Sequence, residues 1–324
     1  MKQAYTAFLA CLLILALFIP CTFATKWRVN NTGIAANFIT AQQAAGSASV
    51  IIGDTLYLES SVVSYGSLTL SKRLVIVGPG FFLGQNPATQ ANLAPAILDN
   101  LVFTTGSKGS HVTGMTVLSW TNVQDTAIML TRNNLADVAI SGTSINNYLA
   151  QNFITSLSIS GSSGNQILNN LVNKSDNCNN GNCFSMNNTS SATVRNNIFN
   201  GCQVINGCTY ENNIATGSVA GGNNLFTANN STVSNNIGAS TQYGSNNGNK
   251  SNINMATVFV NAGSDDGRYQ LLPGSPASGA GTGGVDCGIF GGSTAYVLSG
   301  VPNLPSIWYI NINGSAVTVK ALSH

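Results

Sequence analysis

A short hydrophobic pattern recurs through the middle of the chain. It consists of an apolar residue, any residue, Gly or Asn, two more residues and usually a second apolar residue. Regular copies start at Ile76, Val112, Ile140, Ile167, Val194 and, more weakly, Val233, and an extra copy at Tyr210 is out of step. Successive regular copies lie 36, 28, 27, 27 and 39 residues apart. Because units this short cannot bury a core alone, the pattern predicts units that stack on their neighbours.

Each copy predicts a short strand, a sharp bend and a second short strand. Gly tolerates the positive φ of such a bend, and Asn is the next best tolerated residue. Stacked bends of this kind would also align Asn side chains in hydrogen-bonded ladders. Helical periodicity is limited to "FITAQQAA" at 38–45. The chain is therefore predicted to be all-β, a right-handed parallel β-helix. A sandwich or barrel is the alternative, and it would need hairpin turns between longer alternating strands.

Both ends of a solenoid need covering. Residues 25–60 predict an N-terminal cap and first coil, with a strand at Trp27-Arg28-Val29 and a short helix over the open core. Residues 61–268 hold the repeats, and 269–324 predict a C-terminal cap with terminal strands. In "YQLLPGSPASGAGTGGVDCGIFGG" at 269–292, Asp286 is expected to accept backbone amides. Two alternating runs around Asn313-Gly314 predict a final hairpin.

The first 24 residues have the pattern of a secretory signal peptide. Lys2 is followed by an apolar run from Phe8 to Ile19 and by small residues ending at Ala24. A membrane anchor and a lipoprotein site at Cys21 are the alternatives. Cleavage after Ala24 predicts a protein that is secreted, periplasmic or on the cell surface, with no membrane span in the mature chain.

Composition narrows the class of partner. Only 7% of residues are charged and the formal net charge is +2. Such a surface offers little to a phosphate backbone, which argues against nucleic-acid binding. Disorder is also disfavoured, because 44% of the chain is hydrophobic.

Five cysteines follow the leader, and export favours disulfides. Local spacing suggests Cys178–Cys183 and Cys202–Cys208, with Cys287 buried and free, while cross-pairing between the two loops stays open. No pair has short C-x₂-C spacing and only two histidines exist, so no metal site is expected.

Several stretches resemble one known group. "GDTLYLE" at 53–59, "KRLVIVGPGFFL" at 72–83, the "DCGIFGG" of 286–292 and "YVLSGVPNLPSI" at 296–307 are similar to secreted right-handed parallel β-helix proteins with the pectin-lyase-like fold, of the type found in Bacteroidetes. The resemblance implies the fold. It implies no single activity, since the fold hosts lyases, hydrolases, adhesins and binding proteins.

Catalytic residues are sparse. A lyase acting on an acidic polysaccharide would need acidic ligands and a base, and Asp125, Arg132 and Asp137 form the nearest set. No cofactor is expected, and calcium would have a role only under that alternative. Asp265-Asp266 is interpreted as a surface turn and His111 as a strand start.

Binding is the favoured function. Trp120, Tyr148 and Tyr210 lie near turns rich in Asn and Ser and are candidate sugar platforms. We therefore expect an exported, monomeric β-helix without an evident catalytic site that interacts with a polysaccharide or cell-surface glycan or is associated with the cell surface; a structural surface protein without a ligand is a further possibility. The alternative is the polysaccharide lyase, or a glycoside hydrolase.

Overall fold

The computed structural model describes residues 24–174, 183–187, 190–201, 203–204, 207–217 and 231–323. The expected signal peptide, apart from Ala24, lies outside the described residues, and so do Cys178 and Cys202. No described helix is long and apolar enough to cross a membrane.

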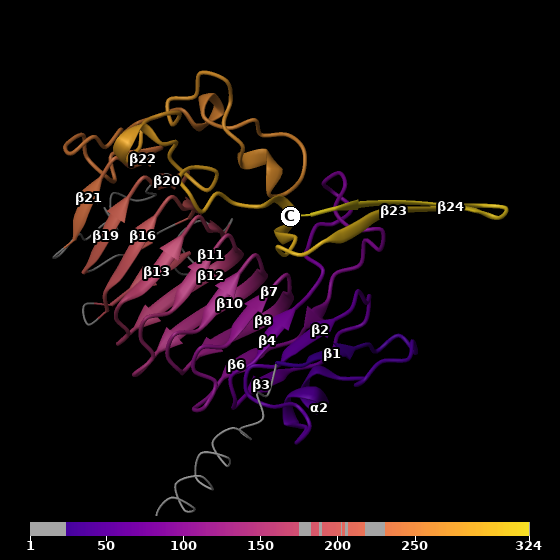
Figure 1. The fold of residues 1–324 in the computed structure, drawn as a ribbon. Helices are drawn as coiled ribbons and strands as arrows, with labels where there is room; N and C mark the ends of the chain where they lie inside the picture. The colour runs from indigo at the N-terminus through magenta and orange to yellow at the C-terminus, as the bar shows by residue number, and fades with distance from the viewer. Residues whose placement is uncertain are drawn as a thin grey trace, which may run out of the picture.

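The chain forms a parallel β-helix, as the repeat predicts (Figure 1). The first sheet, here the A sheet, has ten strands in chain order. They are β1 (Lys26–Val29), β2 (Thr55–Leu58), β4 (Val75–Val77), β7 (His111–Thr113), β9 (Met129–Thr131), β11 (Tyr148–Ala150), β13 (Asn165–Leu168), β16 (Ala192–Arg195), β19 (Cys208–Glu211) and β21 (Thr232–Ser234).

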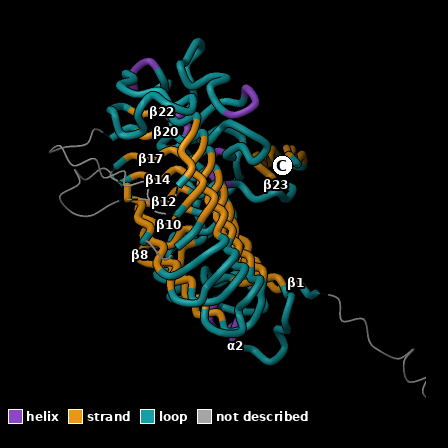
Figure 2. The backbone as a smooth tube through the Cα atoms, turned by 90° about the vertical axis from the view of Figure 1, so that its left-hand side faces the viewer, coloured by secondary structure: helices purple, strands orange, loops and turns teal. Residues whose placement is uncertain are grey.

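The second sheet, the B sheet, has twelve strands and stacks alongside the first (Figure 2). They are β3 (Leu68–Leu70), β5 (Ile97–Leu98), β6 (Leu101–Phe103), β8 (Thr116–Val123), β10 (Asn134–Ser141), β12 (Phe153–Ser160), β14 (Leu171–Asn173), β15 (Phe184–Met186), β17 (Ile198–Asn200), β18 (Gln203–Val204), β20 (Ile214–Ala215) and β22 (Ile237–Gly238). The chain passes between the two sheets, so one turn of the solenoid supplies a strand to each.

The core is a set of stacked files of apolar side chains. Register along the A sheet aligns one inward residue from each coil, and all of these are buried: Leu56, Ile76, Val112, Leu130, Leu149, Ile167, Val194 and Tyr210. Burying each of the aliphatic residues contributes about 1.5–3 kcal/mol. The short helix α2 (Ala41–Gly46) closes the N-terminal end by burying Ala41, Ala44 and Ala45.

The register corrects the predicted repeat. The copy at Ile140 lies in β10 of the B sheet, whereas Leu130 and Leu149 occupy the A-sheet positions on either side of it. The copy at Tyr210 is a regular coil, because β19 pairs with β16 and β21. The prediction failed because Gly142 marks a different bend, after β10, with its own positive φ of 70°.

From the bend after β9 onward, buried asparagines at the bends from the A sheet into the B sheet form one continuous ladder. In each step the Oδ1 of the next Asn accepts both the backbone N–H and the Nδ2 of the one before. The backbone bonds are 2.8–3.0 Å long from Asn133 through Asn152, Asn170, Asn197, Asn213 and Asn236 to Asn249. The ladder satisfies polar groups that would otherwise be buried without partners.

The chain then reverses. We call residues 281–305 the return strap, because side chains at the bends of successive coils contact it in reverse order. Asn235 donates to Thr282 Oγ1, Asn196 to Asp286 O, Asn169 to Ile289 O, Gln151 to Ala295 O and Arg132 to Val301 O. The predicted cap at 269–292 thus starts at the last coils and continues back along the solenoid (Figure 1). Asp286 accepts the Gly279 amide, as expected.

The strap and the segment before it cover a second apolar cluster outside the solenoid. Leu171, Ile198, Ile214 and Ile237 are aligned across the B sheet and pack with buried residues such as Val258 and Ile289. Asp266 is fully buried here and accepts the Ser299 amide at 2.7 Å, so its interpretation as part of a surface turn was wrong. Single-turn 3₁₀ helices occur at Met255–Thr257 and Gly267–Tyr269, and tight turns with left-handed central residues occur at Thr282–Gly284 and Leu298–Gly300.

The chain ends in an antiparallel hairpin of β23 (Ser306–Asn313) and β24 (Ala316–Leu322) that projects from the body (Figure 1). This confirms the expected terminal hairpin, which stands away from the solenoid as an appendage.

Candidate functional site

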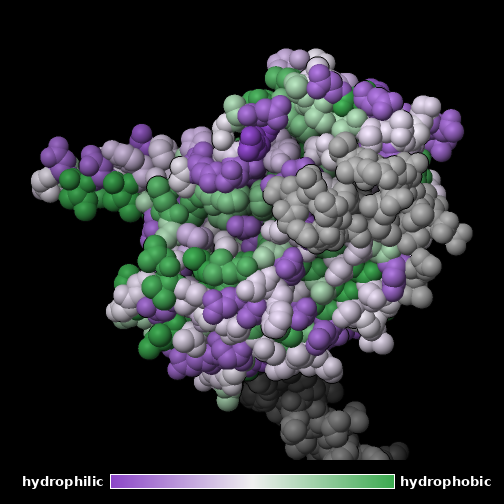
Figure 3. Space-filling view, turned by 180° about the vertical axis from the view of Figure 1, so that it is seen from behind, coloured by the Kyte–Doolittle hydropathy of each residue, from purple (hydrophilic) through white to green (hydrophobic). Residues whose placement is uncertain are grey.

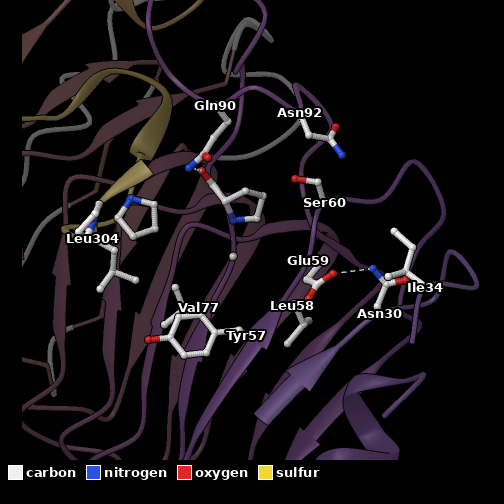
Figure 4. A pocket seen from close by; sticks show the side chains of 14 residues that line it. Asn30, Ile34, Tyr57, Leu58, Glu59, Ser60, Val77, Gln90, Asn92 and Leu304 are labelled. Carbon is white, nitrogen blue, oxygen red and sulfur yellow. Dashed lines mark hydrogen bonds between the residues drawn. The ribbon is translucent and has the colours of Figure 1, made fainter. Parts of the chain in front are cut away.

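Outward side chains of the A sheet and the end of the strap enclose a groove, here called the A-face groove. It has two cavities of about 400 Å³ and about 380 Å³ that share Tyr57, Val77, Pro302 and Leu304. In Figure 4, Tyr57 and Val77 lie side by side beneath Leu304, and Asn30 and Glu59 form the opposite side. The groove is therefore a cleft between the solenoid and a segment almost 250 positions later in sequence.

Strand alternation explains the groove floor. In β2, Leu56 and Leu58 point into the core and Tyr57 points out. Parallel register places Tyr57 next to Val77, then Thr113 and Thr131, on one outward row. Thr55, Val75, His111, Met129 and Tyr148 form the row beside it. The outward rows thus offer aromatic, hydroxyl and imidazole groups on a flat surface.

The larger cavity contains an ionised carboxylate whose charge is balanced by an ion pair. Glu59 accepts a hydrogen bond from Asn30 Nδ2 at 2.7 Å and pairs with Arg28. Burial opposes ionisation of Glu59, but the hydrogen bonds from Arg28 and Asn30 hold its pKa below the ordinary value. This end of the groove carries no uncompensated charge from Glu59.

The smaller cavity contains a cation with neutral partners. Arg132 is half-buried, its Nε donates to Gln151 Oε1 at 2.8 Å, and its NH1 donates to Val301 O at 2.9 Å. Among the described residues, the ion pairs are Arg28–Glu59 and Arg195–Glu211, and Arg132 takes part in neither. Burial lowers its pKa from the ordinary value, but a guanidinium stays charged in proteins.

His111 lies beside Arg132 on the floor of this cavity. Its Nε2 is 2.7 Å from Thr131 Oγ1. Burial, and secondly the positive charge of Arg132, lower the pKa of His111. The imidazole is therefore neutral at neutral pH, which leaves the guanidinium as the charged group of the cavity.

The three candidate catalytic residues occupy different parts of the coil. Asp125 lies in the turn after β8, where it accepts the amides of Gly106 and Lys108 at 2.9 and 2.8 Å. Asp137 points outward from β10, on the other sheet, and accepts a hydrogen bond from Ser156. Of the three, Arg132 alone lines the groove. The carboxylates have structural partners in turns and between strands.

The three candidate sugar platforms also lie in different parts of the structure. Tyr210 is 0% exposed and stacks on Phe199 in the core, so its prediction as a sugar platform was wrong. The pattern placed it near a turn, but its strand position is an inward one. Trp120 is 53% exposed on the outer face of β8, beside Asp137. Tyr148 is half-buried and lies on the A-sheet row of His111, two coils away.

The described cysteines are free thiols. Cys183, Cys208 and Cys287 are buried, and no disulfide forms among the described residues. Burial raises the pKa of Cys183 and of Cys287 to about 12 and that of Cys208 to about 11. The buried, free state expected for Cys287 is confirmed. Cys183 and Cys208 were expected in bridges to Cys178 and Cys202, which lie outside the described residues.

Sequence reasoning missed most of the groove. Tyr57 could have been found, because it alternates with two leucines in "TLYL" and must therefore point outward. His111 was interpreted only as a strand start. The wall formed by Pro302 and Leu304 had no local signal, since it depends on where the strap ends. Among the described residues no three His, Cys, Asp or Glu side chains are grouped so as to hold a metal ion.

Comparisons with protein-family models, with curated proteins and with solved structures gave no match to this chain.

Proposed function

We propose that the protein binds an acidic polysaccharide in the A-face groove. The observation that carries the proposal is Arg132, a half-buried guanidinium that faces the cavity with only neutral hydrogen-bond partners among the described residues. A half-buried cation without a counter-charge favours an anionic ligand group. A sugar carboxylate would satisfy it with a charge-assisted hydrogen bond.

Length and surface chemistry support a polymer rather than a small anion. Tyr57 and Tyr148 lie on the same sheet face, four coils apart in the register. At about 4.8 Å per coil they are roughly 19 Å apart. Aromatic faces at that separation, with Thr113 and Thr131 on the coils between them, suit a chain of sugar rings.

Replacement of Arg132 tests the proposal. Loss of a hydrogen bond to a charged group costs about 1.5–3 kcal/mol, so Arg132→Gln should weaken binding of an acidic polysaccharide by roughly 10- to 100-fold. Binding is measured by titration calorimetry across alginates, pectates and matched neutral glucans. Arg132→Lys, which keeps the charge, should retain part of the affinity.

Arg195→Gln is the matched control, because Arg195 also lies on the A sheet but already pairs with Glu211. It should bind like the parent protein. Equal affinity of the Arg132→Gln and parent proteins, with equal melting temperatures, would contradict the proposal. So would tighter binding of neutral than of acidic polysaccharides.

The lyase alternative is tested by the ultraviolet absorption of the same mixtures of protein and polysaccharide. Its expected carboxylates, Asp125 and Asp137, do not line the groove, which is why binding is the favoured proposal. A lyase would leave unsaturated uronate ends with a new ultraviolet absorption, and a binding protein would leave the polymer intact.

A further inference from the structure

The terminal hairpin has one fully apolar face. Cross-strand register pairs Ile310 with Val319 and Ile312 with Val317. Directly opposed residues lie on the same side of a ribbon, so all four share a face. They are 53%, 52%, 70% and 61% exposed, respectively. Nothing else in the described chain covers this face.

The opposite face is polar. Tyr309 pairs with Lys320 and Asn311 with Thr318. The shift in register between Ile307 and Tyr309 lets both Trp308 and Tyr309 contact the ammonium of Lys320, at 5.1 and 5.0 Å from the ring centroids. Figure 3 shows the two kinds of side chain on opposite sides of the projecting hairpin, hydrophobic below and hydrophilic above. The amphipathic pattern is that of a sheet that packs on another layer.

A two-stranded ribbon needs such a layer. An isolated hairpin is marginally stable in water, and a third strand or a packed face is usually required. The hairpin contacts the body mainly at its base, where Ser306 Oγ donates to Thr89 O and Ala91 N–H donates to Ile307 O. Its outer half therefore has no supporting layer within the described chain.

We propose that this face packs on the same face of a second copy of the chain. A two-fold axis through the hairpin would place the Ile310–Val319 pair of one copy on the Ile312–Val317 pair of the other, an isologous contact. The face carries no charge, Lys320 points away from it, and the net charge of +2 gives little repulsion between copies. The hairpin also projects from the solenoid, which leaves its outer half accessible (Figure 1).

Other occupants fit less well. Insertion into a lipid surface would lead with the tip, and the tip residues Asn313, Gly314 and Ser315 are polar or lack an apolar side chain.

The interface of the proposed dimer is small. The four aliphatic side chains of one copy bury less than the roughly 800 Å² per partner of a stable interface. The dimer is therefore concentration-dependent, with an affinity in the micromolar range or weaker.

Sedimentation velocity tests the dimer, using protein that starts at Thr25 so that the apolar run of the leader does not associate by itself. The parent protein should shift from monomer toward dimer as its concentration rises. The double variant Ile312→Thr, Val317→Thr keeps β-branched residues in the strands and should stay monomeric over the same range. Asn311→Thr on the opposite face is the control and should dimerise like the parent.

Circular dichroism and thermal melting of each variant check that the solenoid is intact. A parent protein that stays monomeric at the highest concentration would overturn the proposal. Dimerisation that survives in the double variant would overturn it as well, because the contact would then lie elsewhere. If the monomeric parent instead co-sediments with phosphatidylcholine vesicles and the double variant does not, the occupant of the face is a lipid surface. The self-association does not rest on polysaccharide binding, which the Arg132 variants test separately.

Discussion

At the bends from the A sheet into the B sheet after β9, β11, β13, β16, β19 and β21, two adjacent residues have different tasks. The first has positive φ, between 52° and 60°, at Arg132, Gln151, Asn169, Asn196, Asn212 and Asn235. Its side chain hydrogen-bonds to the return strap. The second is the ladder asparagine, which points inward. A pair such as Asn169-Asn170 therefore joins its coil both to the next coil and to the strap.

Removal of one ladder side chain should lower the free energy of unfolding. Asn152→Ala would leave the backbone N–H and Nδ2 of Asn133 without their acceptor and Leu130 O without its donor. Each of these three unsatisfied buried groups costs about 1–3 kcal/mol, so the free energy of unfolding should fall by at least about 3 kcal/mol. Urea unfolding measures it. Asn122→Ala, on the outer face of β8, should stay within about 0.5 kcal/mol of the parent, and equal losses in both variants would argue against the ladder.

The raised pKa values of the buried thiols predict that they resist alkylation. Burial raises the pKa of Cys183 and Cys287 to about 12 and of Cys208 to about 11, so these groups are protonated at pH 8. Only thiolate reacts with iodoacetamide, and its fraction is roughly one in a thousand or less. Peptide mass mapping should find the three residues unmodified in native protein and fully alkylated in guanidinium. A bridged peptide joining Cys178 to Cys183 would contradict the free thiol.

At the scale of elements, the sequence predicts what is local and repeated. The stacked strands, the short helix and the final hairpin are all confirmed, because strand alternation, helical periodicity and a glycine-containing turn at Gly314 act within a few residues. The predicted phase of the repeat was wrong at Ile140. The coils differ in length, and Gly or Asn occurs both at bends before B-sheet strands and at bends after them. A spacing of 28 between copies therefore hid a change from one sheet to the other.

The candidate site was predicted less well than the fold. Whether an aromatic residue is a platform depends on which way its strand faces, and the position of Tyr210 near a turn suggested the surface while its strand faces the core. The sequence offered Arg132 as a candidate catalytic residue beside Asp125 and Asp137, whereas its hydrogen-bond partners Gln151 and Val301 come from another coil and from the strap. Contacts between such distant segments leave no mark on local sequence spacing.

At the scale of the whole molecule, the strap connects stability to the groove. It passes from the last coils back to Arg132 and then supplies the groove wall at Pro302 and Leu304. At Gly300 the strap backbone packs closely against Phe81 and the Arg132 carbonyl. Gly300 has a φ of 54°, and an added Cβ would lie 2.2 Å from Phe81 Cε1 and 2.5 Å from Arg132 O. Only a residue without a side chain fits there.

Gly300→Ala should therefore loosen the strap and the groove together. Left-handed backbone costs about 1–2 kcal/mol for a residue with a Cβ, and overpacking adds about 1–3 kcal/mol, so the expected loss of unfolding free energy is about 2–5 kcal/mol. Gly283→Ala is the matched control, since its φ is also positive, at 73°, but its Cβ would meet nothing within 4 Å. It should show only the backbone cost. Because Val301 accepts from Arg132 NH1, Gly300→Ala should also weaken polysaccharide binding at temperatures where the solenoid remains folded. Urea unfolding and calorimetry on both variants measure the two effects, and unchanged affinity in a destabilised Gly300→Ala protein would separate the strap from the binding site.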